Sequence, residues 1–194
     1  MSVLLIAGSP SLRSRSQTLL RFVRQYLEAR GGAVDEVHVR NLAPQALLFA
    51  DTTHTTIVNA VEQVARASLI VIATPVYKTA YSGVLKAFLD LLPQSALKDK
   101  TVLPIATGGS AHHMLALDYA LRPVLQSLAA RQILPGVYAT DSQVVSQADG
   151  SYEVGDEIAA RLEEGAANLF SEVARMQPPG VFETVSFSQV RCSV

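Results

Sequence analysis

Serine and arginine residues gather in one short stretch near the amino terminus of this 194-residue chain. The apolar run Val3–Ala7 ends in Gly-Ser-Pro, and the stretch Gly8–Ser16 then supplies four serines and two arginines before a helical pattern begins. Small polar residues at a strand-to-helix turn expose backbone N–H groups, and the positive end of the helix dipole adds to their attraction for anions. The stretch matches neither the Gly-x-Gly-x-x-Gly fingerprint nor the Walker loop, so it favours a terminal phosphate monoester. The alternative is an ordinary capped turn with Ser16 as the N-cap.

Two further loops carry residues that suit a flat heterocycle. The first follows the apolar run Leu69–Ala73 and combines a proline with two tyrosines. The second follows Val102–Ala106, where the paired Gly108 and Gly109 allow a close backbone approach. Loops at the carboxyl ends of parallel strands meet at one edge of a doubly wound sheet. One loop suited to phosphate and two suited to a planar ring together indicate FMN.

The elements that must position these loops alternate between strands and helices. Short runs rich in branched apolar residues predict strands buried on both faces, and amphipathic stretches between them predict helices. This alternation predicts one α/β domain with a doubly wound sheet of five parallel strands and helices on both faces. The predicted strands are Val3–Ala7, Val34–Val39, Leu69–Ala73, Val102–Ala106 and Ile133–Ala139, the last interrupted by Pro135 and Gly136. The predicted helices are Gln17–Arg30, Thr55–Ala67, Gly83–Leu91, His113–Ala130 and Glu157–Met176, with some helical character at Pro44–Phe49.

Composition and charge argue against several classes of protein. Hydrophobic residues make up 49% of the chain, and the net charge of -1 argues against nucleic acid as a partner. No apolar run approaches the ~20 residues of a membrane helix, so we expect no membrane partner. The single cysteine, Cys192, precludes an internal disulfide, and the amino terminus lacks a signal-peptide pattern, so we expect a cytoplasmic protein. The adjacent His112 and His113 do not face each other on a helix, so we expect no metal site.

Four longer blocks of sequence identify a family. The chain resembles the NAD(P)H-dependent FMN reductases of the flavodoxin-like superfamily, and among them the reductase components of two-component alkanesulfonate monooxygenase systems. The resemblance rests on AGSPSLRSRSQTLL, ATPVYKTAYSGVLKAFLDLLPQ, LPIATGGSAHHMLALDYALRPVL and GVYATDSQV, which span most of residues 3–145. It implies a flavodoxin-like domain over residues 1–176 with strand order 2-1-3-4-5. The tail 177–194 changes composition, and we expect it either to be disordered or to add a strand to a neighbouring subunit.

The resemblance also implies which residues bind FMN. Many relatives carry an arginine where this chain has Ser11, so we expect Arg13 or Arg15 to supply that charge. Ser9, Ser14, Arg15 and Ser16 would hold the phosphate, Pro75, Val76, Tyr77 and Lys78 would line the isoalloxazine, and Thr107, Gly108, Gly109 and Ser110 its far edge. Hydride passes from NADPH, or from NADH, to the flavin ring, so the protein needs no acid, base or nucleophile, and we expect no catalytic residue.

A proline in a helical pattern leads to a prediction about Tyr119. In His113–Ala130, Pro123 cannot donate to the Tyr119 carbonyl, at a cost of ~3 kcal/mol in a regular helix. We predict a π-bulge near Tyr119, the alternative being a plain kink with Tyr119 packed in the core. The resemblance implies a tyrosine inserted at a subunit interface, where it keeps flavin exchangeable. We expect a homo-oligomer, a dimer or a tetramer, formed by the helices that carry Leu85–Leu92 and Met114–Leu128.

Three functions fit these observations. The first is a flavin reductase that supplies reduced FMN to a partner alkanesulfonate monooxygenase in sulfur acquisition. The second is a reductase that keeps its FMN and reduces quinones or azo dyes. The third is a flavodoxin, a one-electron carrier, against which the net charge of -1 and the absence of tryptophan count.

Overall fold

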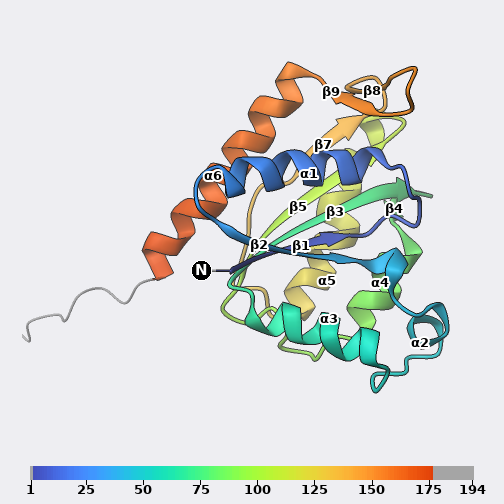
Figure 1. Cartoon of the computed structure of the whole chain (residues 1–194), viewed down its shortest axis with the longest axis vertical. Helices are drawn as coiled ribbons and strands as arrows, with labels where there is room; N and C mark the ends of the chain where they lie inside the picture. The colour runs from blue at the N-terminus through green and yellow to red at the C-terminus, as the bar shows by residue number, and fades with distance from the viewer. Residues whose placement is uncertain (1, 177–194) are drawn as a thin grey trace, which may run out of the picture.

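Parallel strands form the central sheet of the computed structural model, which describes residues 2–176 (Figure 1). The tail predictions for 177–194 lie outside the described residues. The strands are β1 (Ser2–Ala7), β2 (Ala33–His38), β3 (Leu69–Tyr77) and β5 (Thr101–Gly108), followed by β6 (Gln132–Ile133) and β7 (Val137–Thr140), which share the fifth position. The order is β2-β1-β3-β5-β6, with β7 also on β5, and all these pairs are parallel, so the predicted order is confirmed.

Helices cover both faces of the sheet, as the alternating pattern predicted. One face carries α1 (Arg15–Glu28) and α6 (Asp156–Met176), and the other carries α3 (Thr55–Arg66), α4 (Gly83–Asp90) and α5 (Arg122–Ser127) (Figure 1). A short 3-10 turn, η1 (Val39–Asn41), and α2 (Pro44–Leu48) follow β2. Within residues 2–176, none of the helices combines the length and the apolar character that crossing a membrane demands.

The core consists of two layers because successive residues of a strand point to opposite faces. In β1, Leu4 and Ile6 pack toward the α4 side, whereas Val3 and Leu5 pack toward α1 and α6. All of these side chains are fully buried, which explains why the strands read as continuous apolar runs.

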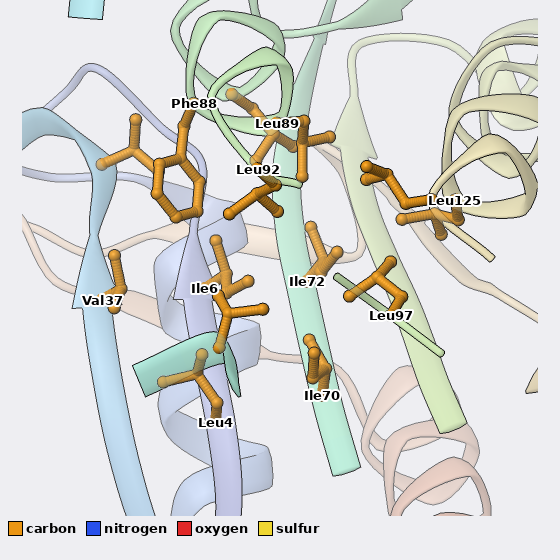
Figure 2. Close-up of a cluster of buried hydrophobic side chains, with 14 of the residues drawn as sticks. Leu4, Ile6, Val37, Ile70, Ile72, Phe88, Leu89, Leu92, Leu97 and Leu125 are labelled. Carbon is orange, nitrogen blue, oxygen red and sulfur yellow. The ribbon is translucent and has the colours of Figure 1, made fainter. Parts of the chain in front are cut away.

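The larger apolar side chains of α4 pack in this core. We expected Leu85–Leu92 to carry more apolar surface than one sheet face covers. In the structure Leu85, Phe88 and Leu89 of α4, and Leu92 just after it, are buried in the core of their own chain. Figure 2 shows Phe88, Leu89 and Leu92 facing the strands. These four side chains are therefore accounted for by the core, and they do not by themselves indicate an interface.

A proline in the middle of β5 explains why the fifth strand is split in two. The N–H of Leu134 donates to the carbonyl of Val102, so Val102 and the residue two further on, Pro104, face the same neighbour. Pro104 has no N–H to donate, and the neighbouring strand pairs with β5 only before and after this point. The predicted strand Ile133–Ala139 is therefore present, interrupted opposite Pro104.

The segment after β5 confirms the predicted π-bulge. The expected helix His113–Ala130 is three elements: a 3-10 helix η2 (Ala111–Leu115), a π-helix η3 (Leu117–Leu121) and α5. The N–H of Arg122 donates to the carbonyl of Leu117, five residues earlier, and Pro123 then occupies the first turn of α5, where a missing N–H costs little. Tyr119 is 79% exposed, so it is not a packed core aromatic.

Candidate functional site

The loops after β1, β3 and β5 meet around one cavity of about 270 Å³. They do so because the carboxyl ends of parallel strands lie at the same edge of the sheet. Most of the predicted site residues line this cavity: Ser9, Ser14, Arg15, Pro75, Val76, Tyr77, Thr107, Gly108 and Gly109. The remaining wall comes from Ser11, Arg13, Asp141 and Tyr152.

Three predicted residues, Ser16, Lys78 and Ser110, do not line the cavity. Ser16 is fully buried, and its hydroxyl lies 2.9 Å from that of Ser14. Lys78 is exposed at the tip of a hairpin. Ser110 holds the third loop, because its hydroxyl accepts from the N–H of His112 and its carbonyl accepts from Tyr138 at 2.6 Å.

At the serine-rich end, a helix begins at the cavity wall. Helix α1 begins at Arg15, so the N-cap is Ser14 and not Ser16, and within the described chain the Ser14 side chain makes no capping hydrogen bond. The Ser9 hydroxyl accepts from the N–H of Ser11 at 3.2 Å, which folds the turn. The first N–H groups of a helix lack intrahelical partners. The Ser14 hydroxyl contacts the Ser16 hydroxyl at 2.9 Å instead of capping the helix, so the first N–H groups of α1 remain available to an anion.

Arg15 is fixed by partners that lie far away in the sequence. Its Nε donates to the carbonyl of Val144 at 2.9 Å, and its Nη1 lies 3.5 Å from Oδ1 of Asp141. Its guanidinium lies over the ring of Tyr152, 5.0 Å from the centroid, a cation–π contact. Arg15 therefore reaches the cavity in a defined orientation.

A β-hairpin that the sequence did not predict supplies part of this wall. It consists of β8 (Val144–Ser146) and β9 (Tyr152–Val154), which pair antiparallel. At its turn Gly150 has a φ of +78°, and a Cβ there would clash with Nη1 of Arg13. The hairpin thus packs closely on the arginines of the first loop.

The second and third loops form the end of the cavity that would hold a planar ring. Strand β3 continues through Pro75 to Tyr77 and turns back into β4 (Ala80–Tyr81). The two turn residues, Lys78 and Thr79, have φ values of 50° and 66°, the left-handed pair of a type I′ turn. Residues other than glycine are strained there, and such strain concentrates at functional sites.

Gly108 is required by a neighbouring tyrosine. A Cβ at Gly108 would lie 2.5 Å from the hydroxyl oxygen of Tyr138, whereas one at Gly109 would meet only Asp141, at 3.9 Å. Burial, with the nearby Asp141 charge, raises the pKa of the Tyr138 hydroxyl above its usual value. The hydroxyl therefore stays protonated at neutral pH and donates to the third loop.

A buried serine connects the first loop to the second. The hydroxyl of Ser82 donates to the carbonyl of Gly8 and accepts from the N–H of Leu85, so it also caps α4. The N–H of Ser82 donates in turn to the Thr74 hydroxyl at 3.0 Å. Ser82 is 1% exposed, so water cannot replace these bonds.

Replacing Ser82 with alanine should destabilise the protein by about 2 kcal/mol, because a cap is lost and the Gly8 carbonyl loses its partner. Denaturant unfolding measures this change. The control is Ser127→Ala, which removes an exposed hydroxyl bonded to the carbonyl of Val124 and should cost much less. Equal costs for the two variants would show that the link between the loops is unimportant.

Other features do not compete with this site. A second cavity, of about 420 Å³, lies beside α2 and α4, and its walls are apolar residues such as Leu42, Leu47 and Val84, with Arg40 among them. None of the described residues that line it carries a side-chain hydroxyl for a phosphate. Nowhere in residues 2–176 do three His, Cys, Asp or Glu side chains gather closely enough to hold a metal ion.

The donors around the first cavity fit a flat molecule with a phosphate at one end. Serine hydroxyls, two arginines and the start of α1 lie together, and Pro75, Tyr77 and the glycine pair border the other end. Arginine and hydroxyl donors suit phosphate oxygens, and aromatic and glycine surfaces suit a planar ring.

The chain is similar in sequence to known proteins. The family described as NADPH-dependent FMN reductase matches residues 1–144. FMN reductase (NADPH) of Escherichia coli K12 is 49% identical over 145 residues, covering 75% of this chain and 76% of that protein. FMN reductase (NADPH) of Pseudomonas putida KT2440 is 51% identical over 144 residues, covering 74% and 73%.

Solved structures give the same picture at the level of the fold. A crystal structure of NADH:FMN oxidoreductase (EMOB) in its apo form superposes with a TM-score of 0.80 at 40% identity, covering 88% of this chain and 89% of that one. A Streptococcus pneumoniae flavodoxin, 14% identical with a TM-score of 0.61, covers 88% of this chain and shares the flavodoxin-like fold. The chain therefore belongs to the NADPH-dependent FMN reductase family, and it is an NAD(P)H:FMN oxidoreductase.

Proposed function

We propose that this FMN reductase releases its reduced flavin to a separate flavin-dependent monooxygenase, of the alkanesulfonate type, in cytoplasmic sulfur acquisition. The observation that carries the proposal is the cavity itself: its phosphate end is rich in donors, but its ring end offers little to hold a flavin permanently. The sequence resemblance to the reductases of alkanesulfonate systems supports the choice of partner.

The chain's own residues bind and align the two substrates. Hydride transfer from nicotinamide to flavin is the chemistry that the bound molecules supply. Ser9, Ser14 and Arg15 would hold the phosphate, Pro75 and Tyr77 with the glycine pair would border the ring, and the binding of both molecules would set their relative orientation. The side chains that line the cavity thus act through alignment and charge rather than as acid or base.

Weak stacking supports the release of flavin. Of the described residues that line the cavity, Tyr77 and Tyr152 are aromatic. The ring of Tyr152 already contacts the Arg15 guanidinium. Tyr77, 47% exposed, is left as the aromatic surface for the ring. A ring that stacks on one exposed tyrosine gains less than a ring held between two aromatics.

Purification tests the release directly. The protein should elute from gel filtration nearly colourless and should oxidise NADPH only after FMN is added. A yellow protein with one FMN per chain, active on quinones or azo dyes without added flavin, would contradict the proposal.

NADPH is the proposed reductant. The two relatives of about half identity are FMN reductases named for NADPH, whereas the EMOB structure is that of an NADH enzyme at 40% identity. A steady-state comparison of NADPH and NADH at saturating FMN decides between them.

We further propose that the chain forms a dimer or a tetramer through the segment around the π-helix. Met114, Leu115 and Tyr119 are 49%, 51% and 79% exposed there, an apolar surface beside the third loop. This narrows the broader interface that the sequence suggested, because the larger apolar side chains of α4, Leu85, Phe88 and Leu89, are buried in their own chain.

Deleting Tyr119 should convert the releasing enzyme into one that retains FMN. Removing one residue from the π-helix lets the segment return to regular α-helical bonding, which changes the surface beside the flavin site. We expect the variant to elute yellow and to lose flavin transfer to a monooxygenase.

The control for this deletion is Tyr119→Ala, which keeps the residue count and hence the π-helix, and should stay nearly colourless. A colourless deletion variant with normal FMN turnover would disprove the role of Tyr119. Sedimentation of the unmodified protein that shows only monomer at micromolar concentration would disprove the interface.

A further inference from the structure

We propose that Asp141 sets how weakly this enzyme holds FMN, by competing with the flavin phosphate for Arg15. The proposal rests on the cavity being the FMN site with Arg15 at its phosphate end. It concerns the affinity of that site for FMN, which the hydrogen-bond donors at the phosphate end do not determine alone.

The geometry places a carboxylate inside the phosphate-binding end. Oδ1 of Asp141 lies 3.5 Å from Nη1 of Arg15, and both side chains line the cavity. Arg15 does not need Asp141 for its orientation, since the Val144 carbonyl accepts from its Nε at 2.9 Å and the Tyr152 ring lies beneath it. The Asp141 carboxylate therefore contributes a negative charge to this end of the cavity more than it helps to orient Arg15.

The backbone fixes Asp141 at this place. Its N–H donates to the carbonyl of Gly108 at 3.2 Å, which ties it to the end of β5. Its Oδ2 lies 3.9 Å from the Cβ position of Gly109, so the carboxylate stands between the third loop and Arg15. Its negative charge also contributes to the raised pKa of the Tyr138 hydroxyl.

The second arginine of the phosphate end also has a carboxylate nearby. Arg13 contacts Gly150 at the hairpin turn, and its positive charge helps to lower the pKa of the adjacent Asp149, after the larger effect of the Ser151 hydrogen bonds. Asp149 does not line the cavity, whereas Asp141 does. Of the two carboxylates, Asp141 is the one that a bound phosphate would meet.

A phosphate drawn to Arg15 is repelled by Asp141, because the two side chains lie 3.5 Å apart and line the same cavity. Attraction by Arg15 and repulsion by Asp141 partly cancel, so the net electrostatic attraction of this end for the phosphate is small. A small attraction suits an enzyme that must release its flavin. Asp141 is 49% exposed and Arg15 30%, so water and salt screen both interactions. The expected effect of the carboxylate is therefore a few-fold change in affinity rather than a thousandfold one.

The test replaces Asp141 with asparagine, which keeps the shape and removes the charge. Dissociation constants for FMN and riboflavin, measured by quenching of flavin fluorescence at low and high salt, give the readout. Asp141→Asn should lower the Kd for FMN about fivefold at low salt, with a smaller gain at high salt, and change the Kd for riboflavin less than about twofold.

The matched control is Glu28→Gln, which makes the same change of net charge. Glu28 pairs with Nε of Arg24 at 2.8 Å, in the last turn of α1. The substitution therefore removes an arginine–carboxylate ion pair that lies away from the cavity. It should leave both dissociation constants unchanged. Asp141→Ser is a second variant without the charge, to be used if the asparagine variant does not fold.

The outcomes separate this inference from the site assignment. If Asp141→Asn leaves the FMN affinity unchanged, or weakens it, the inference is wrong, and weakening would show that the carboxylate positions Arg15. If the unmodified protein binds riboflavin as tightly as FMN, the phosphate site itself is wrong. Tightening of FMN and riboflavin alike would also overturn the inference, because the charge would then not act on the phosphate.

Discussion

Replacing Ser14 with alanine is expected to raise the KM for FMN about tenfold or more, with riboflavin turnover nearly unchanged. Ser14 lines the cavity at the start of α1, and within the described chain its hydroxyl does not cap the helix. A hydrogen bond to a charged phosphate contributes about 1.5–3 kcal/mol, and riboflavin has no phosphate to receive it. Steady-state rates with each flavin at saturating NADPH measure the two effects.

Thr18→Ala is the control for this variant. Thr18 lies one turn further along α1, where its hydroxyl donates to the Ser14 carbonyl at 3.3 Å, and it does not line the cavity. It should leave the KM for FMN within about twofold, because no phosphate contact is lost. An equal rise for FMN and riboflavin in Ser14→Ala would show that the hydroxyl supports the loop rather than the phosphate.

Replacing Gly108 with alanine is expected to cost about 3 kcal/mol of stability and to impair FMN reduction. The new methyl group would lie 2.5 Å from the Tyr138 hydroxyl oxygen, so the buried tyrosine must move and give up its bond to the Ser110 carbonyl. The third loop would lose the contact that holds it at the cavity. Thermal unfolding and FMN turnover measure both consequences.

The neighbouring glycine provides the control for Gly108→Ala. At Gly109 a Cβ would meet only Asp141, at 3.9 Å, so Gly109→Ala should be nearly neutral in stability. Adding Tyr138→Phe to Gly108→Ala removes the clashing oxygen and should recover part of the loss, a non-additive result. If Gly108→Ala is as stable as Gly109→Ala, the close approach of Tyr138 does not limit the loop.

The position of the three loops could be predicted because it follows from topology. Apolar runs such as Leu69–Ala73 identify strands, parallel strands end at one edge, and polar or glycine-rich residues after each run then belong to one site. The π-helix was predictable for a different reason, since Pro123 in a helical pattern requires a local solution.

Contacts between distant segments could not be predicted from local pattern. The hairpin of β8 and β9 has strands of three residues each, too short for a clear period. Tyr152 reaches Arg15 only through the packing of that hairpin. Asp141 lay within a family-like block of sequence, yet nothing local indicated that its carboxylate would face Arg15.

Two further differences between the sequence predictions and the structure have local physical causes. Ser14 and Ser16 both have the chemistry of an N-cap, so sequence alone could not locate the start of α1. The β3–β4 turn uses Lys78 and Thr79 rather than the Asn-Gly that usually marks a type I′ hairpin, so the hairpin gave no signal.

The catalytic efficiency of the unmodified protein with FMN and with riboflavin, at saturating NADPH, tests the central claim most directly. The claim is that the loops after β1, β3 and β5 form one flavin site whose serine and arginine end binds a phosphate. We predict that kcat/KM for FMN exceeds that for riboflavin by about tenfold or more, because riboflavin lacks the phosphate that these residues bind. Equal efficiencies for the two flavins would contradict it.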